Sequence, residues 1–599
     1  MVSRRTLITI ILMMLTIFFL FQFTQVIKVR NNQYDTNEYA KENILVAREK
    51  FVANTHCEQI IFLGKETGSA YKTVEEWCNY SKRFLKVYSN PTELSKENAA
   101  KAHLVLIDSK TLDVGNYSDY LEELAASKTT MVFLNLPDVK KIKDYATLQS
   151  MLGITEIRKK YMDLEGIQVF EGFLLGGEAA YMPQNEAEKK YNDFEKTIPW
   201  YITGNGTQTY AVAMMSDASV VANDYPRIIW RNNYEGTYIY AVANDFINQD
   251  TGLGFLSAID YSANDYVLYP VVNAQNMVIS DYPVVSSEND ARIKEIYSMD
   301  SQNLSRDIFW PEYVSISTRY NIKLTCFLNT GYETENINEP SDKLMEFYLQ
   351  QLKEIDGEMG RSLDIDDFKG FKEKMKYDAN VLEKGSDYHY SASYAYKLND
   401  EITNAIENNE SYLHRIHTVV STRDKNAELL SYLNNSVTFQ GITNVADEYS
   451  YRNELKQRCM LTSIGYSTTL IDMHKVLFPE EIEDEWQYFS KDVASNINTY
   501  WAKNREFDYT AVSESDTRVR EFLNLKYTYE REDNVITVRT EKTDESYFVL
   551  RTHGEKISEA TNAHVECIEE DAYLIHVYGF ESKIYLDDSD EIFKYDGLL

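Results

Sequence analysis

One long apolar segment near the N-terminus limits how this chain can be placed. Residues 7–27, LITIILMMLTIFFLFQFTQVI, contain no charged side chain among 21 residues. At about 1.5 Å per residue, such a helix measures roughly 30 Å, the thickness of the hydrocarbon core of a bilayer. No small-residue cleavage site follows, so we expect an uncleaved membrane anchor rather than a removed signal peptide. A buried core helix is the alternative.

The charges that flank this segment leave its orientation nearly balanced. Arg4 and Arg5 precede it, whereas Lys28 and Arg30 follow it. The positive-inside rule therefore decides little. No later segment of similar length could return the chain across the membrane. We accordingly expect a single-pass protein of the cell membrane, with residues 1–30 as the anchor and the bulk of the chain extracytoplasmic.

Composition restricts the classes of partner. The net charge of −33 repels nucleic acid, which we exclude as the main partner. An acidic surface would attract a cationic polymer, although acidity also serves solubility alone. The five cysteines are scattered without a CxxC pair, which argues against a zinc ribbon or a redox motif.

A chain of 599 residues is too long for a single core, and its pattern changes along its length. Residues 31–54 are polar and predict a stalk. Apolar strands alternate with helices in 55–265, which predicts an open parallel α/β domain. The turn after its first strand, GKETGSAY, is neither GxGxxG nor a P-loop, so we expect no nucleotide cofactor.

Two further parts complete the expected α/β multidomain fold. The βα alternation resumes in residues 266–528, with enough length for a (β/α) barrel. Residues 529–599 contain short strands separated by turn residues, such as NVITVRTE and AYLIHVYG. That pattern predicts a small C-terminal β-sandwich.

Four short motifs in the predicted barrel follow one another in an informative order. ISDY occupies 279–282, YNIKLTCFL occupies 320–328, GSDYH ends at His389, and LIDMH ends at His474, twelve residues before Trp486. This order resembles the polysaccharide deacetylase superfamily. The chain as a whole resembles the domain-of-unknown-function family numbered 2194. That resemblance implies a membrane anchor, a reductase-like or amidotransferase-like α/β domain, a deacetylase-like barrel, and a link to Pel-type exopolysaccharide operons.

The resemblance also implies roles for particular residues. Asp281 matches the metal-binding aspartate, His389 a metal-binding histidine, and His474 the late histidine acid. Ser280 stands at the position of the catalytic base, and a serine hydroxyl is a poor base. Gly385 occupies the first histidine-ligand position and has no side chain to coordinate a metal. A neighbour such as Asp387 could supply that ligand instead. The site therefore departs from the family pattern at a ligand and at the base.

These departures leave several functions open. The leading expectation is an accessory protein of exopolysaccharide biosynthesis or export, with an inactive deacetylase-like barrel that holds polymer and needs no cofactor. We expect sugar rings to stack on the aromatic side chains of Tyr282, Tyr388, Tyr390 and Trp486. The first alternative is an active deacetylase of amino-sugar polymers that uses a divalent metal such as zinc. The second is a scaffold for membrane polysaccharide synthase or transporter subunits.

Overall fold

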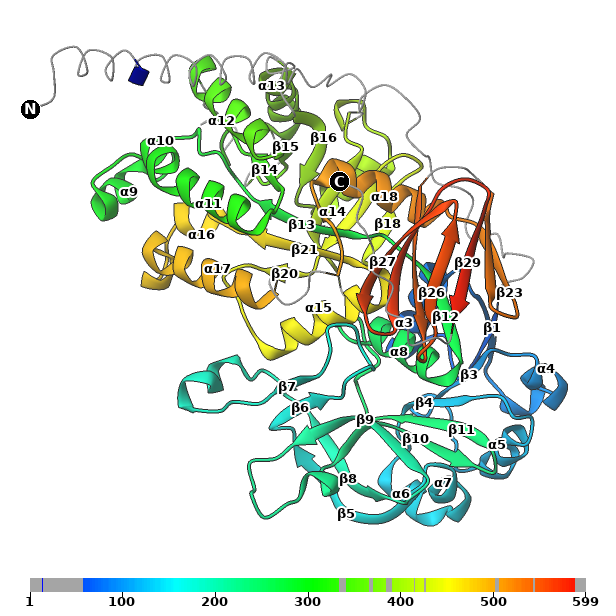
Figure 1. The fold of residues 1–599 in the computed structure, drawn as a ribbon. Coiled ribbons are helices and arrows are strands. Elements are labelled where there is room, and N and C mark those ends of the chain that lie inside the picture. Colours follow the sequence, from blue (N-terminus) through cyan, green and yellow to red (C-terminus); the bar gives the residue numbers. More distant parts are fainter. Residues whose placement is uncertain are drawn as a thin grey trace, which may run out of the picture.

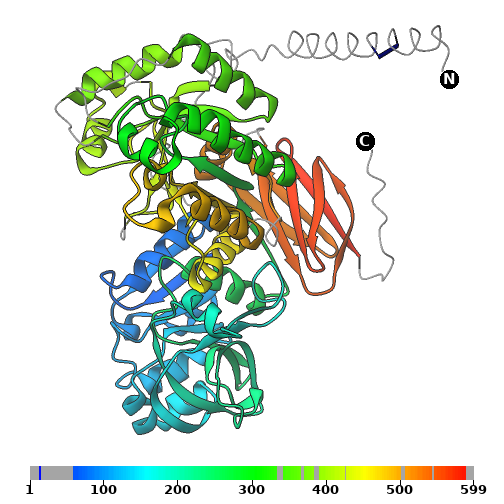
Figure 2. The ribbon, with the colours of Figure 1, turned by 90° about the vertical axis from the view of Figure 1, so that its left-hand side faces the viewer.

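The computed structural model describes residues 13–14, 58–332, 341–365, 370–383, 390–413, 415–424, 427–500, 506–541 and 545–587. Except for Met13 and Met14, the expected anchor and stalk lie outside these ranges. Among the residues within them, no helix combines the length and the apolar character needed to cross a bilayer. The folded part is a mixed α/β multidomain structure with three bodies in contact, visible from two directions in Figures 1 and 2.

The first body contains a nine-stranded sheet in the order β2-β1-β3-β4-β11-β10-β9-β6-β7. Its strands are β1 (Gln59–Leu63), β2 (Phe84–Tyr88), β3 (Leu104–Asp108), β4 (Met131–Asn135), β6 (Gly166–Val169), β7 (Ala179–Tyr181), β9 (Thr207–Met214), β10 (Arg227–Tyr234) and β11 (Thr237–Val242). A separate antiparallel pair consists of β5 (Ile154–Asp163) and β8 (Thr197–Thr203). The helices are α3 (Ser69–Ser81), α4 (Lys96–Ala100), α5 (Ser118–Ala125), α6 (Val139–Asp144), α7 (Ala146–Met151) and α8 (Gly252–Ala263).

The prediction of an open parallel sheet holds for only part of this body. Strands β2, β1, β3, β4 and β11 run parallel, whereas β10, β9, β6 and β7 continue the sheet in antiparallel pairing. A tight turn between β10 and β11 causes the change. Glu235 and Gly236 both have positive φ, 50° and 83°, as a two-residue hairpin turn requires.

A glycine on α8 sets the contact between the first and second bodies. Helix α8 packs against α15 (Tyr451–Ile464) of the second body. A Cβ atom added at Gly254 would lie 2.3 Å from the Cα atom of Cys459 on α15. Gly254 therefore permits the close packing of α8 on α15.

The second body is built on a curled sheet with the order β18-β19-β17-β16-β15-β14-β13-β21-β20, and β22 pairs with β13. Its strands are β13 (Ala274–Ile279), β14 (Leu324–Leu328), β15 (Glu358–Ser362), β16 (Tyr390–Tyr396), β17 (Thr418–Thr422), β18 (Leu430–Tyr432), β19 (Thr438–Ile442), β20 (Asn444–Val445), β21 (Tyr466–Ile471) and β22 (Tyr509–Thr510). The further helices are α9 (Asp290–Tyr297), α10 (Ser301–Leu304), α11 (Trp310–Tyr320), α12 (Asp342–Glu354), α13 (Phe371–Glu383), α14 (Asp400–Glu407), α16 (Met473–Leu477), α17 (Trp486–Tyr500) and α18 (Val512–Asn524).

The curl brings the two ends of this sheet together. Only Thr443 separates β19, which pairs with β17, from β20, which pairs with β21. The backbone N–H of Thr443 donates to the carbonyl of Thr468 on β21 over 2.9 Å. Because β21, β13, β14, β15, β16 and β17 pair in parallel, their carboxyl ends share one rim of the sheet.

The third body is a sandwich of two four-stranded sheets. One contains β12 (Tyr266–Val271), β25 (Ser546–Thr552), β28 (Ala572–Val577) and β27 (Ala563–Glu569). The other contains β23 (Tyr527–Glu532), β24 (Val535–Thr540), β29 (Glu581–Asp587) and β26 (Lys556–Thr561). Strand β12 comes from the range predicted as barrel. Leu268 packs into the sandwich core, while Val267 and Tyr269 pack with Leu461 of α15, so β12 is buried on both faces.

Candidate metal centre

Asp281 follows β13 at the carboxyl rim of the curled sheet. Its φ of 51° turns the chain sharply after the strand, and its side chain is buried. Oδ1 accepts a hydrogen bond from Nδ2 of Asn329 over 2.9 Å, whereas Oδ2 is buried without a hydrogen-bond partner among the described residues. Burial, with the neighbouring Asp364 carboxylate, raises the pKa of Asp281 to about 6. The site therefore holds this acid where its ionised form lacks a compensating positive charge.

Asp364 reaches the same place from the end of β15. Its carbonyl oxygen accepts a hydrogen bond from Nδ2 of Asn329 over 3.3 Å. Its Oδ2 pairs with Nζ of Lys397 over 2.6 Å. Asn329 at the end of β14 thus contacts both acidic residues, one through its side chain and one through its backbone.

His474 completes the group from α16, directly after β21. The helix begins at Asp472, whose Oδ1 accepts the backbone N–H of His474 over 3.1 Å. The imidazole stacks on Phe478 and meets the ring of Tyr332 edge-on, with centroid distances of 4.8 Å and 4.9 Å. Nδ1 of His474 is buried and has no hydrogen-bond partner among the described residues. Two aromatic rings therefore orient an imidazole whose nitrogen is available for a ligand.

The three side chains of Asp281, Asp364 and His474 can present one ligand atom each within 4.8 Å of one another. Two carboxylates and one imidazole suit a divalent ion such as Zn²⁺ or Mn²⁺. Buried polar atoms normally have partners, and an unmade bond to a buried group is costly. Oδ2 of Asp281 and Nδ1 of His474 are both buried without a hydrogen-bond partner among the described residues, which fits a role as ligands of a cation.

Ser280 lies beside this cluster but bonds to a different acid. Its Oγ donates to Oδ1 of Asp472 over 3.1 Å and accepts the backbone N–H of Met473 over 3.2 Å. The pairing of β13 with β21 explains the contact, because Ser280 and Asp472 follow the register partners Ile279 and Ile471. Asp472 lies close enough to Asp281 to contribute to the rise of its pKa. A carboxylate is thus present next to the serine, supplied by the neighbouring strand.

The structure brings some of the sequence-predicted site residues together. Asp281, Ser280 and His474 meet at the rim, as described above. His389 and Tyr388 lie outside the described residues, as do Gly385 and Asp387, and Tyr390 opens β16 with only its backbone described. The predicted ligand His389 therefore stays a prediction.

Tyr282 and Trp486 lie in the core, in contrast to the predicted role of stacking on sugar rings. Tyr282 has no exposed surface and packs against Trp310 and Tyr348, and its hydroxyl donates to the carbonyl of Ser305. Trp486 is 6% exposed, with its ring 4.2 Å from that of Phe309. Polymer could not reach either ring in this conformation. Tyrosine and tryptophan provide apolar area to a core as readily as to a surface.

Asp364 was not identified from the sequence, because the strand that precedes it lacks the apolar pattern of a buried strand. Residues 358–362, EMGRS, include Glu358 and Arg361, yet every residue of β15 is buried. The available signal was the run SLDIDD, in which acids follow a short segment between two helices. A parallel strand after YNIKLTCFL should bring such acids to the same rim as Asp281.

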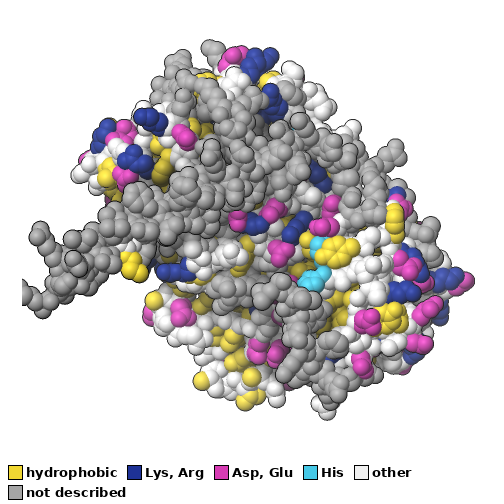
Figure 3. Space-filling view, turned by 45° about the horizontal axis from the view of Figure 1, so that its top comes forward, with side chains coloured by type: hydrophobic (Ala, Val, Ile, Leu, Met, Phe, Trp, Pro, Cys, Tyr) yellow, Lys and Arg dark blue, Asp and Glu magenta, His cyan; other side chains and the backbone are white. Residues whose placement is uncertain are grey.

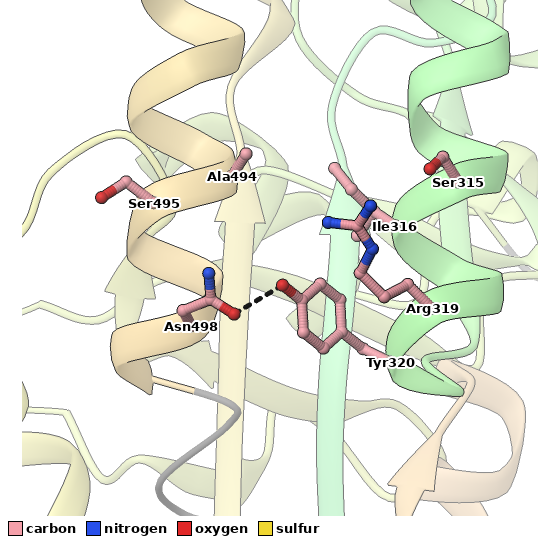
Figure 4. A pocket seen from close by; sticks show the side chains of 7 residues that line it. All are labelled: Ser315, Ile316, Arg319, Tyr320, Ala494, Ser495 and Asn498. Atoms are coloured by element: carbon pink, nitrogen blue, oxygen red, sulfur yellow. Dashed lines mark hydrogen bonds between the residues drawn. The ribbon is translucent and has the colours of Figure 1, made fainter.

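A hollow on the outside of the second body lies between α11 and α17, away from the carboxylate cluster. Its volume is roughly 230 Å³, and Figure 4 shows Arg319 and Tyr320 from one helix opposite Asn498 from the other. The hydroxyl of Tyr320 donates to Oδ1 of Asn498 across the gap. This hydrogen bond ties the two helices together where their side chains leave space.

Residues 207–365 match the family described as "Uncharacterised protein conserved in bacteria (DUF2194)". The match confirms, over these residues, the expected resemblance to the domain-of-unknown-function family numbered 2194. It extends from the start of β9 to the residue after Asp364, and so includes Asp281, Asn329 and Asp364 of the candidate site. No curated protein matches the sequence.

Several solved structures are similar to this chain at low sequence identity. Agd3, a carbohydrate deacetylase, shares 10% identity with a TM-score of 0.49, over 88% of this chain and 98% of Agd3. A ThuA-like protein from Bacteroides uniformis shares 10% identity with a TM-score of 0.20, over 33% of this chain and 84% of its own. A GH30 endoxylanase from Clostridium papyrosolvens shares 7% identity with a TM-score of 0.25, over 54% and 100%.

Proposed function

We propose that this protein is a metal-dependent carbohydrate deacetylase that removes acetyl groups from an amino-sugar polymer. The observation that carries the proposal is the convergence of Asp281, Asp364 and His474 on one point, with two buried polar atoms left unbonded. The order of motifs that resembles the polysaccharide deacetylases supplies the reaction class.

Each of the three side chains offers a ligand atom to a divalent ion. Oδ2 of Asp281, one carboxylate oxygen of Asp364 and one imidazole nitrogen of His474 would hold it. When bound, such an ion supplies a water molecule of lowered pKa and polarises the acetyl carbonyl. Lys397 keeps Oδ2 of Asp364 occupied, which favours coordination through its other oxygen. His474 then serves as a ligand, in place of the acid role that the family resemblance implied.

Asp472 is the residue best placed to accept the proton of the attacking water. Its carboxylate lies next to the cluster, and Ser280 and the backbone of His474 both donate to Oδ1, leaving Oδ2 for a proton. The same group can return that proton to the departing amine. The carboxylate missing at residue 280 is in this way replaced from β21.

This arrangement favours an enzyme over an inactive polymer-holding protein. The inactive alternative depended on a missing ligand and a missing base, and Asp364 and Asp472 offer both groups. It also depended on aromatic platforms, and Tyr282 and Trp486 are buried. Among the described residues on the face shown in Figure 3, Asp and Glu side chains are interspersed with Lys and Arg side chains.

We propose further that the enzyme acts on exopolysaccharide at the outer side of the cell membrane. The apolar segment 7–27 supports the location, and the family resemblance supports the polymer class. An N-acetylated sugar is neutral and its deacetylated product is cationic, so the reaction would convert a neutral chain into one that adheres to anionic surfaces.

Metal analysis and acetate release test the proposal directly. We expect the purified full-length chain to bind one equivalent of Zn²⁺ or Mn²⁺ and to release acetate from N-acetylglucosamine oligomers. Asp364→Asn should lower metal affinity about 10-fold or more, whereas Asp472→Asn should lower turnover and keep the metal. A fully metal-loaded chain that binds oligomers without releasing acetate would instead favour the polymer-holding alternative.

A further inference from the structure

Helix α13 places a lysine in the interior behind the candidate metal centre. Lys374 has no exposed surface, and its partner Asp378, one turn along the helix, is 1% exposed. Nζ of Lys374 lies 3.1 Å from Oδ2 of Asp378 and 3.0 Å from Oγ1 of Thr330. Burying an ion pair contributes little net stability, because desolvation offsets the attraction. The position of this pair therefore calls for an explanation other than stability.

The third bond of Lys374 points toward the site. Nζ donates to Oδ1 of Asn329 over 3.0 Å, and the backbone N–H of Gly331 donates to the same oxygen over 3.1 Å. An ammonium group can only donate, so the atom facing it must be the amide oxygen. The Nδ2 group of Asn329 is thereby directed at Asp281, to which it donates over 2.9 Å.

We infer that Lys374 is a positioning residue for the metal centre and acts through Asn329. The inference rests on the proposed function. With its amide fixed, Asn329 holds Oδ1 of Asp281 and the backbone carbonyl of Asp364 at the same time. Oδ2 of Asp281 makes no hydrogen bond among the described residues and is left to act as a ligand atom. Partners that orient ligands in this way typically affect metal affinity 10- to 100-fold.

The same contacts would also arise if Lys374 served only to hold α13 on β14. The two roles differ in what a substitution changes. A packing role lowers the unfolding temperature and leaves the metal affinity of the folded protein intact. A positioning role weakens metal binding in a protein that remains folded, and it does so only while Asn329 is present to pass the effect on.

A double substitution removes the pair without leaving a buried charge. Lys374→Met together with Asp378→Leu replaces both charges with apolar groups of similar size, a change that buried ion pairs often tolerate. The matched control is Asp516→Leu together with Arg520→Met, which removes another buried pair of the same spacing on α18. That helix contacts the opposite end of the curled sheet, through Thr438 at the start of β19.

Zinc affinity, measured on the full-length chain by competition with a chromogenic chelator, is the readout. We expect the Lys374 variant to bind Zn²⁺ about 10-fold more weakly. The control should stay within about 3-fold, and thermal unfolding should show that both variants are folded. Asn329→Ala should weaken binding similarly, and adding it to the Lys374 variant should cause no further loss, since both act in one chain of contacts.

The outcomes separate this inference from the proposed function. If the unaltered chain binds no zinc, both fail. If it binds zinc and the folded Lys374 variant binds it equally well, or if the losses from Asn329 and Lys374 simply add, the positioning role fails and the metal centre stands.

Discussion

Two clusters in this protein each combine two carboxylates with a histidine and differ in how the carboxylates are paired with cations. At the amino-terminal edge of the first sheet, Arg83 lies 2.7 Å from Asp260 and 2.8 Å from Glu58, and His103 contacts the same two acids. At the rim of the curled sheet, Asp281, Asp364 and His474 have no such residue at their centre among the described parts of the chain. Both clusters therefore bring two carboxylates and an imidazole together. In the first cluster one guanidinium pairs with both acids, whereas in the second Lys397 pairs with Asp364 and no ion pair with Asp281 is seen among the described residues.

The pKa values show what the difference means. Burial alone would raise the pKa of Asp260 and of Glu58, yet Arg83 and His103 outweigh it and lower both. Burial and Asp364 raise the pKa of Asp281 to about 6, and no guanidinium opposes them. The first cluster is complete as a structural lock between bodies, since Tyr529 of the sandwich also donates to Glu58. Under the proposed function, a bound cation would supply the positive charge that Asp281 lacks in the second cluster.

Removing the cation of the first cluster should have the largest effect. Arg83→Met leaves Glu58 and Asp260 buried without their main partner, and breaking a buried ion pair typically costs about 3–5 kcal/mol. Chemical denaturation followed by tryptophan fluorescence should show this loss. Arg539→Ala, which removes two half-exposed ion pairs from β24 to Glu530 and Glu581, is the control and should cost about 1 kcal/mol or less. Equal effects from the two variants would mean that the buried cluster is not a lock.

Removing a carboxylate of the second cluster should raise the stability of the metal-free protein rather than lower it. Because the folded pKa of Asp281 is about 6 and the ordinary value is 3.8, the folded state binds this proton more tightly. The associated stability is present below about pH 4 and is lost as pH rises through 6, a change of about 3 kcal/mol. Asp281→Asn avoids that loss and should raise the free energy of unfolding at pH 7.5. Asparagine also tolerates the positive φ of this position.

The matching experiment is the same denaturation with zinc present. Zinc should stabilise the unaltered chain at pH 7.5, lose this effect below about pH 6 as Asp281 takes up its proton, and leave Asp281→Asn unaffected. The free energy of unfolding of the metal-free protein should be compared with that of Asp281→Asn at each pH, because the difference isolates Asp281 from the other acids. A difference in favour of the unaltered chain that grows between pH 4 and 6 would contradict this assignment.

The smallest effect is expected at Ser280, which donates to Asp472 beside the second cluster. Ser280→Ala removes one hydrogen bond to Asp472 and should cost about 1 kcal/mol of stability. Zinc affinity should change less than 3-fold, while turnover falls because Asp472 is less well held. Calorimetric titration with zinc measures the affinity, and acetate release measures the turnover. A large loss of zinc would show that Asp472 or the serine belongs to the coordination sphere.

The parts of the site that could be predicted from sequence are those that local motifs carry. Asp281, Ser280 and His474 each follow an apolar strand, and the end of such a strand is recognisable without knowledge of its neighbours. Asp364 follows β15, whose Glu358 is buried because Thr325 and the backbone of Ser513 donate to it. Partners that are distant in sequence make that strand possible, so the apolar pattern on which strand prediction depends is missing.

The fold shows the same limit. Alternation of strands and helices predicted the first and second bodies, and short strands with turns predicted the sandwich. The pairing of β12 with β25 joins residues that are far apart in the chain, and it reverses the assignment of 266–271 to the barrel. Similarly, the aromatic rings of Tyr282 and Trp486 carry no local mark of whether they face a core or a ligand.

Because β12 packs against both the sandwich and the second body, the choice of truncation sites is restricted. A truncation after residue 528 would remove β25, the strand with which β12 pairs, and expose the backbone edge of β12 and the side chain of Leu268, a template for aggregation. Because β12 runs on within a few residues into β13, the damage would begin close to Asp281. The sandwich is therefore not a separable domain, and expression trials should retain it together with the second body.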